Sequence, residues 1–176
     1  MTRYRTVFLD RDGTLNVKAA DGEYVTAPDA LVLLPGAAGA VRRLNDAGLR
    51  VVLVSNQRGV GRGLMSPADL DAVQHRLRCM LAAAGARLDA AYLCPHLGGC
   101  ECRKPRPGLL LRAAAELPGL RLDAAVTVGD AESDVAAGRA AGTATVRIGP
   151  PGTATAADAL VADLAAAVDW ILARGR

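Results

Sequence analysis

Two carboxylates, separated by one residue, follow a short apolar run near the start of the chain. The run at residues 7–9 predicts a buried strand, and Asp10 and Asp12 come directly after it. Gly13 allows a sharp turn, so both carboxylates can face one pocket. Acids this close repel each other, and a divalent cation usually relieves the repulsion. One carboxylate can then attack as a nucleophile while the other transfers a proton. A solvated turn or a calcium loop would use the same residues.

A second polar cluster, Ser55, Asn56 and Gln57, follows the apolar run at residues 49–54. That run is typical of a strand buried on both faces. A hydroxyl at its end can hydrogen-bond a phosphoryl oxygen, and the glycines nearby allow backbone amides to approach one. The alternative is an ordinary helix-capping or turn cluster.

A third cluster, Arg103 and Lys104, precedes the helix expected at residues 108–117. A lysine there can supply a mobile positive charge to both a nucleophile and a phosphate. A solvated basic turn would look the same in the sequence. The pair therefore indicates an anion site only together with the other clusters.

A fourth cluster follows the apolar run at residues 124–128. Asp130 can complete an oxygen-rich Mg²⁺ site with Asp10. Asp134 is placed to orient a neighbour such as Lys104. Acids at this position can also simply stabilise the N-terminus of the following helix.

Four soft metal ligands lie within nine residues, in the segment 94–102. Cys94, His96, Cys100 and Cys102 supply three thiolates and one imidazole, a closed tetrahedral set that suits a structural Zn²⁺. The alternatives are reduced thiols beside an incidental histidine, or a redox pair at Cys100 and Cys102. The density of ligands favours zinc.

Strands and helices alternate along the whole chain. Strands are expected at residues 6–9, 49–54, 90–93, 124–128 and 144–148, and helices after Gly36, after Ser66, and at 108–117, 131–141 and 157–173. This order predicts an α/β fold, with a mostly parallel sheet between two layers of helices. Each polar cluster lies at or just beyond the C-terminal end of a strand, apart from Lys104 on the loop beyond residue 93. In open α/β sheets ligands bind at that edge.

Length and composition set the remaining bounds. The 176 residues suit one domain spanning 1–176, and 51% of them are hydrophobic, which excludes disorder. A net charge of +3 is too balanced for a nucleic-acid-binding surface. With no apolar run long enough for a membrane and no leader pattern, we expect a cytoplasmic monomer with reduced cysteines.

The four strand-end clusters resemble the motifs of the haloacid dehalogenase superfamily of phosphatases. The cysteine segment that runs into residues 102–105 is similar to its histidinol-phosphate and heptose-bisphosphate phosphatase branch, with the heptose-bisphosphate family the closer match. The resemblance implies a Rossmann-like three-layer sandwich without a large cap domain. It also implies two-step phosphoryl transfer, with Asp10 as nucleophile and Asp12 as general acid and base.

The same resemblance assigns the binding roles. Ser55 and Lys104 would hold the phosphoryl oxygens, and Mg²⁺ would bind Asp10, Asp130 and the backbone carbonyl of Asp12. Arg103 would grip the substrate, a small phosphorylated sugar whose 7-phosphate is removed. One further substrate contact is expected at Tyr24, in the loop after the first strand. Others are expected at Asn56 in the second cluster and at Arg58 and Arg62 in the segment that follows it.

Two other functions compete with this interpretation. One is a phosphatase for histidinol phosphate or for a nucleic-acid 3′-phosphate end, the latter disfavoured by the low basicity. The other is a phosphorylatable receiver or a zinc-dependent interaction module without turnover. Asp12 argues against the receiver, because a receiver should retain its phosphate.

Overall fold

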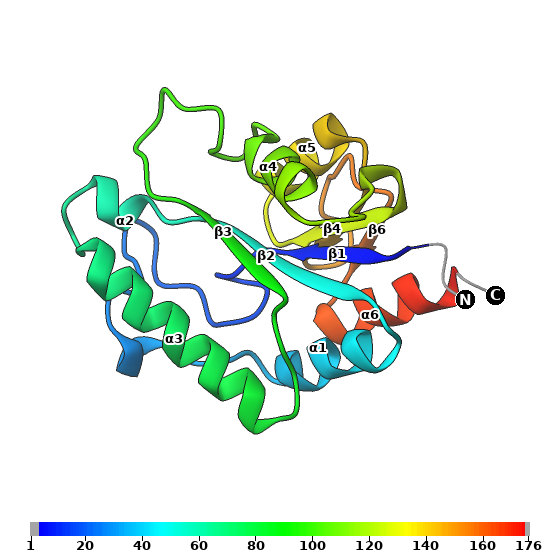
Figure 1. Ribbon diagram of the computed structural model, residues 1–176, viewed down its shortest axis with the longest axis horizontal. Coiled ribbons are helices and arrows are strands. Elements are labelled where there is room, and N and C mark those ends of the chain that lie inside the picture. The colour runs from blue at the N-terminus through cyan, green and yellow to red at the C-terminus, as the bar shows by residue number, and fades with distance from the viewer. Residues whose placement is uncertain (1–3, 175–176) are drawn as a thin grey trace.

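The computed structural model describes residues 4–174, which form one six-stranded sheet in the order β3-β2-β1-β4-β5-β6. Every pair of neighbouring strands is parallel. Figure 1 shows the sheet edge-on, with helices above and below it. The strands are β1 (Thr6–Leu9), β2 (Arg50–Asn56), β3 (Ala90–Cys94), β4 (Ala125–Gly129), β5 (Ala144–Ile148) and β6 (Ala159–Val161).

Helices cover both faces of the sheet, as the three-layer prediction requires. In Figure 1, α1, α3 and α6 lie on one side, and α4 and α5 lie on the other. The helices are α1 (Ala37–Asp46), α2 (Arg58–Gly61), α3 (Pro67–Ala83), α4 (Gly108–Glu116), α5 (Glu132–Ala141) and α6 (Leu164–Ala173), with 3₁₀ turns η1 (Pro28–Ala30) and η2 (Leu122–Ala124).

The central strand β1 is buried on both of its faces. Val7 and Leu9 belong to the core under α1, α3 and α6, whereas Phe8 points to the core under α4 and α5. All three side chains are completely inaccessible to solvent. Because successive side chains of a strand point to opposite faces, a doubly covered strand must be apolar throughout. This explains the unbroken apolar run that precedes Asp10.

The helix α3 begins where the sequence predicts. The Ser66 hydroxyl accepts a hydrogen bond from the Asp69 amide, and the Asp69 carboxylate accepts one from the Ser66 amide. This reciprocal capping satisfies two backbone donors that the first turn leaves unpaired. Leu70, Val73 and Leu77 then form the buried stripe. A firmly started α3 matters for the site, because one of its polar side chains reaches the strand ends.

The expected helix at residues 157–173 is wrong over residues 157–163. Residues Ala159–Val161 form β6, which pairs with β5, and α6 begins only at Leu164. The Asp163 side chain accepts a hydrogen bond from the Ala166 amide and so caps α6 at that point. Leu160 and Val161 are in phase with the apolar face of α6, so helical periodicity alone extended the helix too far.

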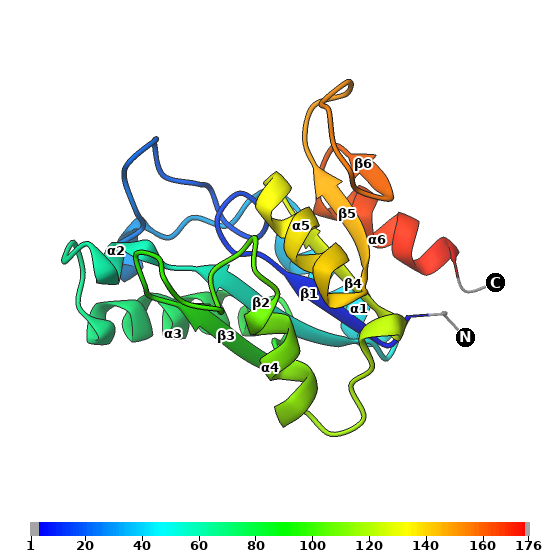
Figure 2. The same ribbon diagram turned by 90° about the horizontal axis from the view of Figure 1, so that it is seen from above.

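The order of the strands indicates where on the sheet a ligand would bind. After β1 the chain builds β2 and β3 on one side, then returns to build β4 on the other side of β1. The crevice at such a reversal, outside the carboxyl ends of the strands, is where open α/β sheets bind ligands. Between β1 and α1 the chain forms an open loop and η1 rather than an inserted domain, as Figure 2 shows. Within residues 4–174, none of the helices combines the length and apolarity that crossing a membrane requires.

Candidate active site

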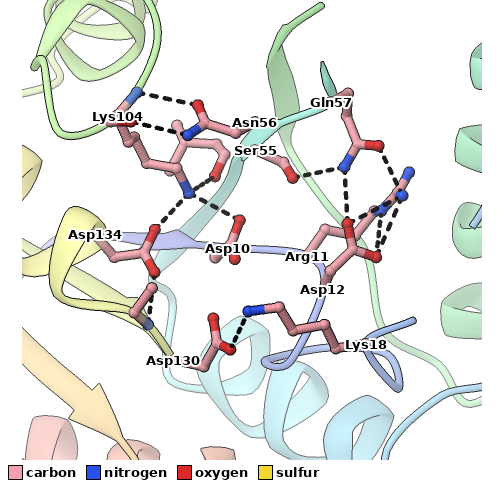
Figure 3. Close-up of polar contacts among 12 residues, drawn as sticks. Asp10, Arg11, Asp12, Lys18, Ser55, Asn56, Gln57, Lys104, Asp130 and Asp134 are labelled. Atoms are coloured by element: carbon pink, nitrogen blue, oxygen red, sulfur yellow. Dashed lines mark hydrogen bonds and ion pairs between the residues drawn. The ribbon is translucent and has the colours of Figure 1, made fainter. Parts of the chain in front are cut away.

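A cavity of about 250 Å³ lies at the carboxyl ends of β1, β2 and β4. It brings together the side chains that the sequence singled out from four separate segments, and Figure 3 shows how they converge. The loop at residues 18–25 forms one wall. The polar side chains in the lining include Asp10, Asp12, Lys18, Tyr24, Ser55, Asn56, Arg103, Lys104, Asp130 and Asp134.

Lys104 is the best-satisfied charge in the cavity. Its Nζ donates to Asp10 Oδ1 at 2.8 Å, to Asp134 Oδ1 at 2.5 Å and to the Val54 carbonyl at 2.8 Å. Only 3% of the residue is exposed. Burial opposes the charged form, but the two carboxylates outweigh it and raise the pKa of Lys104 above its usual value. A permanent cation therefore lies against the Asp10 carboxylate.

The backbone of Lys104 is fixed as well. The Asn56 side chain accepts a hydrogen bond from the Lys104 amide and donates one to the Lys104 carbonyl, both at 3.0 Å. Both polar ends of the Asn56 amide are thus engaged by Lys104. The structure gives Asn56 a positioning contact at the place where the sequence led us to expect a substrate contact.

Two glycines make the approach of the acids possible. Gly13 has φ +87°, and a side chain there would collide with the Asp130 carboxylate. A side chain at Gly129 would collide with Asp134. These two positions explain physically why a glycine accompanies each acidic cluster.

Asp10 and Asp130 form a cation-seeking pair. Burial raises the pKa of Asp10 to about 6, with Lys104 opposing the rise. Burial and the neighbouring Asp10 charge raise the pKa of Asp130, with Lys18 opposing. Carboxylate oxygens of these residues and of Asp134 lie within 4.8 Å of one another. Asp134 is committed to Lys104, so Asp10 and Asp130 are the pair that fits a hard divalent cation.

Asp12 lies in a different environment from Asp10. Arg11 donates to both of its carboxylate oxygens, at 3.1–3.3 Å, and Asn16 and Gln57 each donate at 2.9 Å. Gln57 also donates to the Ser55 hydroxyl at 2.9 Å. In Figure 3 this group lies to one side of Asp10 and Lys104. The two acids therefore have separate sets of partners, as two different chemical roles would require.

Some of the residues expected to hold the substrate lie in the cavity, and others lie outside it. Arg103 and Tyr24 line the cavity, and the Arg103 Nη1 atom is buried without a hydrogen-bond partner among the described residues. Arg58 and Arg62, at the two ends of α2, are exposed and do not contribute to the lining. The structure therefore brings Arg103 and Tyr24 to the site, and leaves the two α2 arginines outside it.

Sequence reasoning missed several polar residues of the site. Lys18 pairs with Asp130 Oδ2 at 3.2 Å, and the buried guanidinium of Arg11 reaches Gln74 on α3. Gln57 was noted only as part of a cluster. The sequence signal for a buried Arg11 was weak. Arg11 lies between two acids at the end of a buried strand, where an arginine side chain has little room to reach solvent.

The cysteine loop, residues 94–102, gathers its four candidate ligands. The sulfur–sulfur distances among Cys94, Cys100 and Cys102 are 3.1–3.6 Å, and His96 Nδ1 lies 3.2 Å from Cys102 Sγ. A tetrahedral Zn²⁺ with bonds of about 2.3 Å needs sulfurs about 3.8 Å apart. Burial would raise the pKa of Cys100, but hydrogen bonds led by that with Cys102 lower it to about 6. The cluster has the composition of a closed zinc site, with sulfurs somewhat closer together than a bound ion would require.

The site combines an aspartate placed to act as a nucleophile, a buried lysine and two further acids at the switch point of a parallel sheet. This arrangement is typical of one class of phosphoryl-transfer hydrolase. The profile of the haloacid dehalogenase-like hydrolases matches residues 3–142. The chain belongs to this family. The match covers all four strand-end clusters, and membership of this family supports Mg²⁺-dependent hydrolysis of phosphoric monoesters by this chain.

Individual relatives narrow the class. The chain is 41% identical to a D-glycero-D-manno-heptose-1,7-bisphosphate 7-phosphatase of Thermosynechococcus vestitus, with 94% of each chain covered. It is 39% identical to the D-glycero-alpha-D-manno-heptose-1,7-bisphosphate 7-phosphatase of Mycobacterium tuberculosis, covering 87% of this chain and 84% of that one. A solved D,D-heptose 1,7-bisphosphate phosphatase from B. bronchiseptica, in complex with magnesium and phosphate, has a TM-score of 0.85 and 34% identity, covering 97% of this chain and 99% of that one.

Proposed function

We propose that this chain removes the 7-phosphate of D-glycero-D-manno-heptose 1,7-bisphosphate through an aspartyl-phosphate intermediate. One observation carries the proposal: Asp10 lies in a cavity with Lys104 on one of its oxygens and with Asp12 and Asp130 beside it. The similarity to heptose-bisphosphate phosphatases from several bacteria supports the substrate.

The acids of the cavity fit a magnesium ion. Asp10, Asp130 and the backbone carbonyl of Asp12 would hold it, which matches the preference of Mg²⁺ for oxygen ligands. When bound, Mg²⁺ neutralises charge on the phosphoryl group. The fit is supported by the raised pKa values of Asp10 and Asp130, since both acids lose charge repulsion when a cation is present.

In the first step an Asp10 oxygen attacks the phosphorus atom, and the bond between phosphorus and the sugar oxygen breaks. Lys104 holds the other Asp10 oxygen and keeps the carboxylate ionised. The Ser55 hydroxyl and the Lys104 ammonium bind phosphoryl oxygens as charge develops on them. Asp12 gives its proton to the leaving sugar oxygen.

In the second step water attacks the phosphorus of the aspartyl phosphate. Asp12, now ionised, accepts the proton of that water, and the bond from phosphorus to Asp10 breaks with its electron pair returning to the carboxylate. The products are inorganic phosphate and the enzyme in its starting state. The loop at residues 18–25 and the cysteine loop would limit the access of bulk water, since no large cap does so.

Arg103 is the proposed grip for the second phosphate of the substrate. Its Nη1 is buried and lacks a partner among the described residues, although buried donors are normally paired. A guanidinium can bind two oxygens of one phosphate. A bisphosphate supplies that second group, whereas histidinol phosphate or a sugar monophosphate does not. This argument favours the bisphosphate over the alternative substrates.

The cysteine loop would carry one structural zinc ion, bound by Cys94, His96, Cys100 and Cys102. Cys94 is the last residue of β3, and the three other ligands lie on irregular backbone. The four ligands contact one another. Gly61 of α2 donates to the Pro95 carbonyl at 2.9 Å, so the loop also docks on α2. A zinc ion would fix the segment that leads directly into Arg103 and Lys104.

The chain would work as a single domain, residues 1–176, in the cytoplasm and as a monomer. Reduced thiols at the zinc ligands are compatible with a reducing compartment.

Phosphate release from a panel of phosphorylated metabolites tests the proposal. Heptose 1,7-bisphosphate, its monophosphates, histidinol phosphate and a 3′-phosphorylated oligonucleotide would be compared at one Mg²⁺ concentration. We expect the highest kcat/KM for the bisphosphate, with release of only one equivalent of phosphate. Equal or better hydrolysis of histidinol phosphate would refute the substrate assignment, and no hydrolysis of any ester would refute the phosphatase.

A further inference from the structure

The Arg11 side chain is a buried charge that the phosphatase mechanism leaves without a role. It is fully inaccessible to solvent, and Gln57, with 1% of its surface exposed, lies against it. Arg11 donates to Asp12, to Gln57 Oε1 at 2.8 Å and to Gln74 Oε1 at 3.1 Å. Burying a guanidinium costs desolvation free energy, which its hydrogen bonds must offset. The three partners of Arg11 supply those bonds, and we ask what else they do in the site.

The partners of Gln57 fix the orientation of its side-chain amide. Its Oε1 faces the Arg11 guanidinium, which can only donate, and its Nε2 faces the Asp12 carboxylate, which accepts when ionised. Turning the amide over would place two donors together and two acceptors together. Arg11 therefore determines which end of Gln57 points toward the acid.

The same amide reaches a second group of the site. Gln57 Nε2 donates to the Ser55 hydroxyl oxygen as well as to Asp12, both at 2.9 Å. Because the Ser55 oxygen accepts this bond, its own proton is free to point elsewhere. Ser55 lines the cavity, so that proton can be donated to a phosphoryl oxygen. One amide thus orients both the proton-transfer group and a phosphate donor.

We propose that Arg11 is a positioning residue, which acts through Gln57 to set the geometry of Asp12 and Ser55 together. The inference rests on the proposed function, and α3 supplies its anchor. Gln74 is itself buried on α3, between the core residues Val73 and Leu77, and holds the far side of the guanidinium. The acid–base group is thereby tied to a helix whose start is firmly capped.

The proposal predicts a defect in the second step as well as in the first. In the second step the oxygen of water bonds to phosphorus, Asp10 leaves with its electron pair, and the proton of water passes to Asp12. A misplaced Asp12 slows this transfer. With p-nitrophenyl phosphate the leaving group needs no proton, so the intermediate forms quickly and then accumulates.

The test compares Gln57→Glu, Arg11→Met and Gln74→Met with the unmodified enzyme, in Mg²⁺, using p-nitrophenyl phosphate and the heptose bisphosphate. Gln57→Glu keeps the size of the side chain and an acceptor for Arg11, but removes both donors. Arg76→Met, an exposed change on α3, is the matched control. Circular dichroism checks folding, so Gln57→Glu remains informative if the loss of buried Arg11 unfolds the chain.

For Gln57→Glu and Arg11→Met we expect kcat to fall about a hundredfold. With p-nitrophenyl phosphate we also expect a burst of close to one equivalent of nitrophenolate per enzyme, and a KM that falls together with kcat because the covalent intermediate accumulates. Gln74→Met should show a several-fold loss of the same kind, and Arg76→Met none. A folded Gln57→Glu enzyme with unchanged kcat, or with a loss that shows neither burst nor KM change, would overturn the proposal.

The two proposals fail in different ways. If the unmodified enzyme hydrolyses p-nitrophenyl phosphate but no sugar bisphosphate, the substrate assignment fails while a burst in Gln57→Glu still supports the role of Arg11. If the unmodified enzyme hydrolyses neither ester, the phosphatase assignment fails and the role of Arg11 falls with it.

Discussion

The cysteine loop at residues 94–102 leads directly into Lys104, which belongs to the strand-end cluster around Asp10, but the two regions are held together differently. In the strand-end cluster the Lys104 ammonium already has three partners, and the acids lie on the ends of strands whose cores are fully buried. In the cysteine loop the four candidate ligands contact one another, and of these four only Cys94 is buried. We expect the first region to be stable without a bound group, and the second to gain order from the proposed zinc ion.

This difference separates function from stability. A substitution in the strand-end cluster should remove turnover and leave the fold nearly unchanged, because the remaining partners still satisfy Lys104. A substitution in the cysteine loop should loosen the chain and reduce turnover indirectly. Four predictions test this contrast, from the largest expected effect on turnover to the smallest.

Asp10→Asn should reduce turnover by at least about 10⁴-fold, the order observed when a nucleophile is removed. Lys104 keeps Asp134 and the Val54 carbonyl, so thermal unfolding should change little. Lys104→Met is the informative counterpart, since it leaves two buried carboxylates without their cation and should lower the melting temperature as well. Phosphate release and calorimetry on both variants check this pair. Substantial activity in Asp10→Asn would rule out the covalent mechanism.

Asp130→Asn should weaken Mg²⁺ binding by about tenfold or more, because one of the two available charges is lost. Titration calorimetry with Mg²⁺ alone measures this without relying on turnover, and the concentration of Mg²⁺ for half-maximal activity should rise in parallel. Asp46→Asn, an exposed acid on α1, is the control. Unchanged Mg²⁺ affinity in Asp130→Asn would remove Asp130 from the metal site.

The sequence predicted the fold because its central strands β1, β2 and β4 are buried on both faces. Apolar runs such as residues 7–9 are therefore unbroken, and the change to acids and hydroxyls marks the edge where the sheet binds its ligand. The boundary between β6 and α6 was missed because Leu160 and Val161 are in phase with the helix. Local pattern cannot show that these residues pair with β5 instead.

The site was predictable to the extent that each group follows its own strand. Asp10, Ser55 and Asp130 were found for that reason. The role of Arg11 was not, since its burial depends on Gln74, which lies 63 positions away in the sequence. The expected substrate contacts of Arg58 and Arg62 remain predictions, and both residues are exposed and outside the cavity lining. Their position after β2 in the sequence does not determine which way α2 faces.

Arg103→Met should lower kcat/KM for the heptose bisphosphate by about 10–150-fold, since a hydrogen bond to a charged group contributes about 1.5–3 kcal/mol. The loss should be smaller for a monophosphate, so the preference between the two substrates shrinks. Arg76→Met is the matched control, because Arg76 is exposed on α3 and outside the cavity lining. Kinetics with both substrates on all three proteins are needed. An equal loss on both substrates would show that Arg103 does not bind the second phosphate.

Cys100→Ser should have the smallest effect on turnover, about three- to tenfold, and a clear effect on stability. Removing one of four ligands weakens zinc binding, and the loop that leads into Arg103 and Lys104 then loses its fixed shape. Asn56 still holds the Lys104 backbone from β2, which is why catalysis should survive in part. For a chain of this size each kcal/mol shifts the melting temperature by about 2–4 °C, so a fall of roughly 5 °C or more is expected.

Cys79→Ser provides the control for that prediction, because Cys79 is exposed on α3, away from the cysteine loop. Elemental analysis should find about one zinc ion per chain in the unmodified protein and in Cys79→Ser, and much less in Cys100→Ser. Dialysis of the unmodified protein against a strong zinc chelator, followed by readdition of Mg²⁺ alone, should reproduce the Cys100→Ser behaviour. If zinc-free protein instead keeps its full activity and melting temperature, the cysteine loop is ordered without a metal, and the contrast between the two regions disappears.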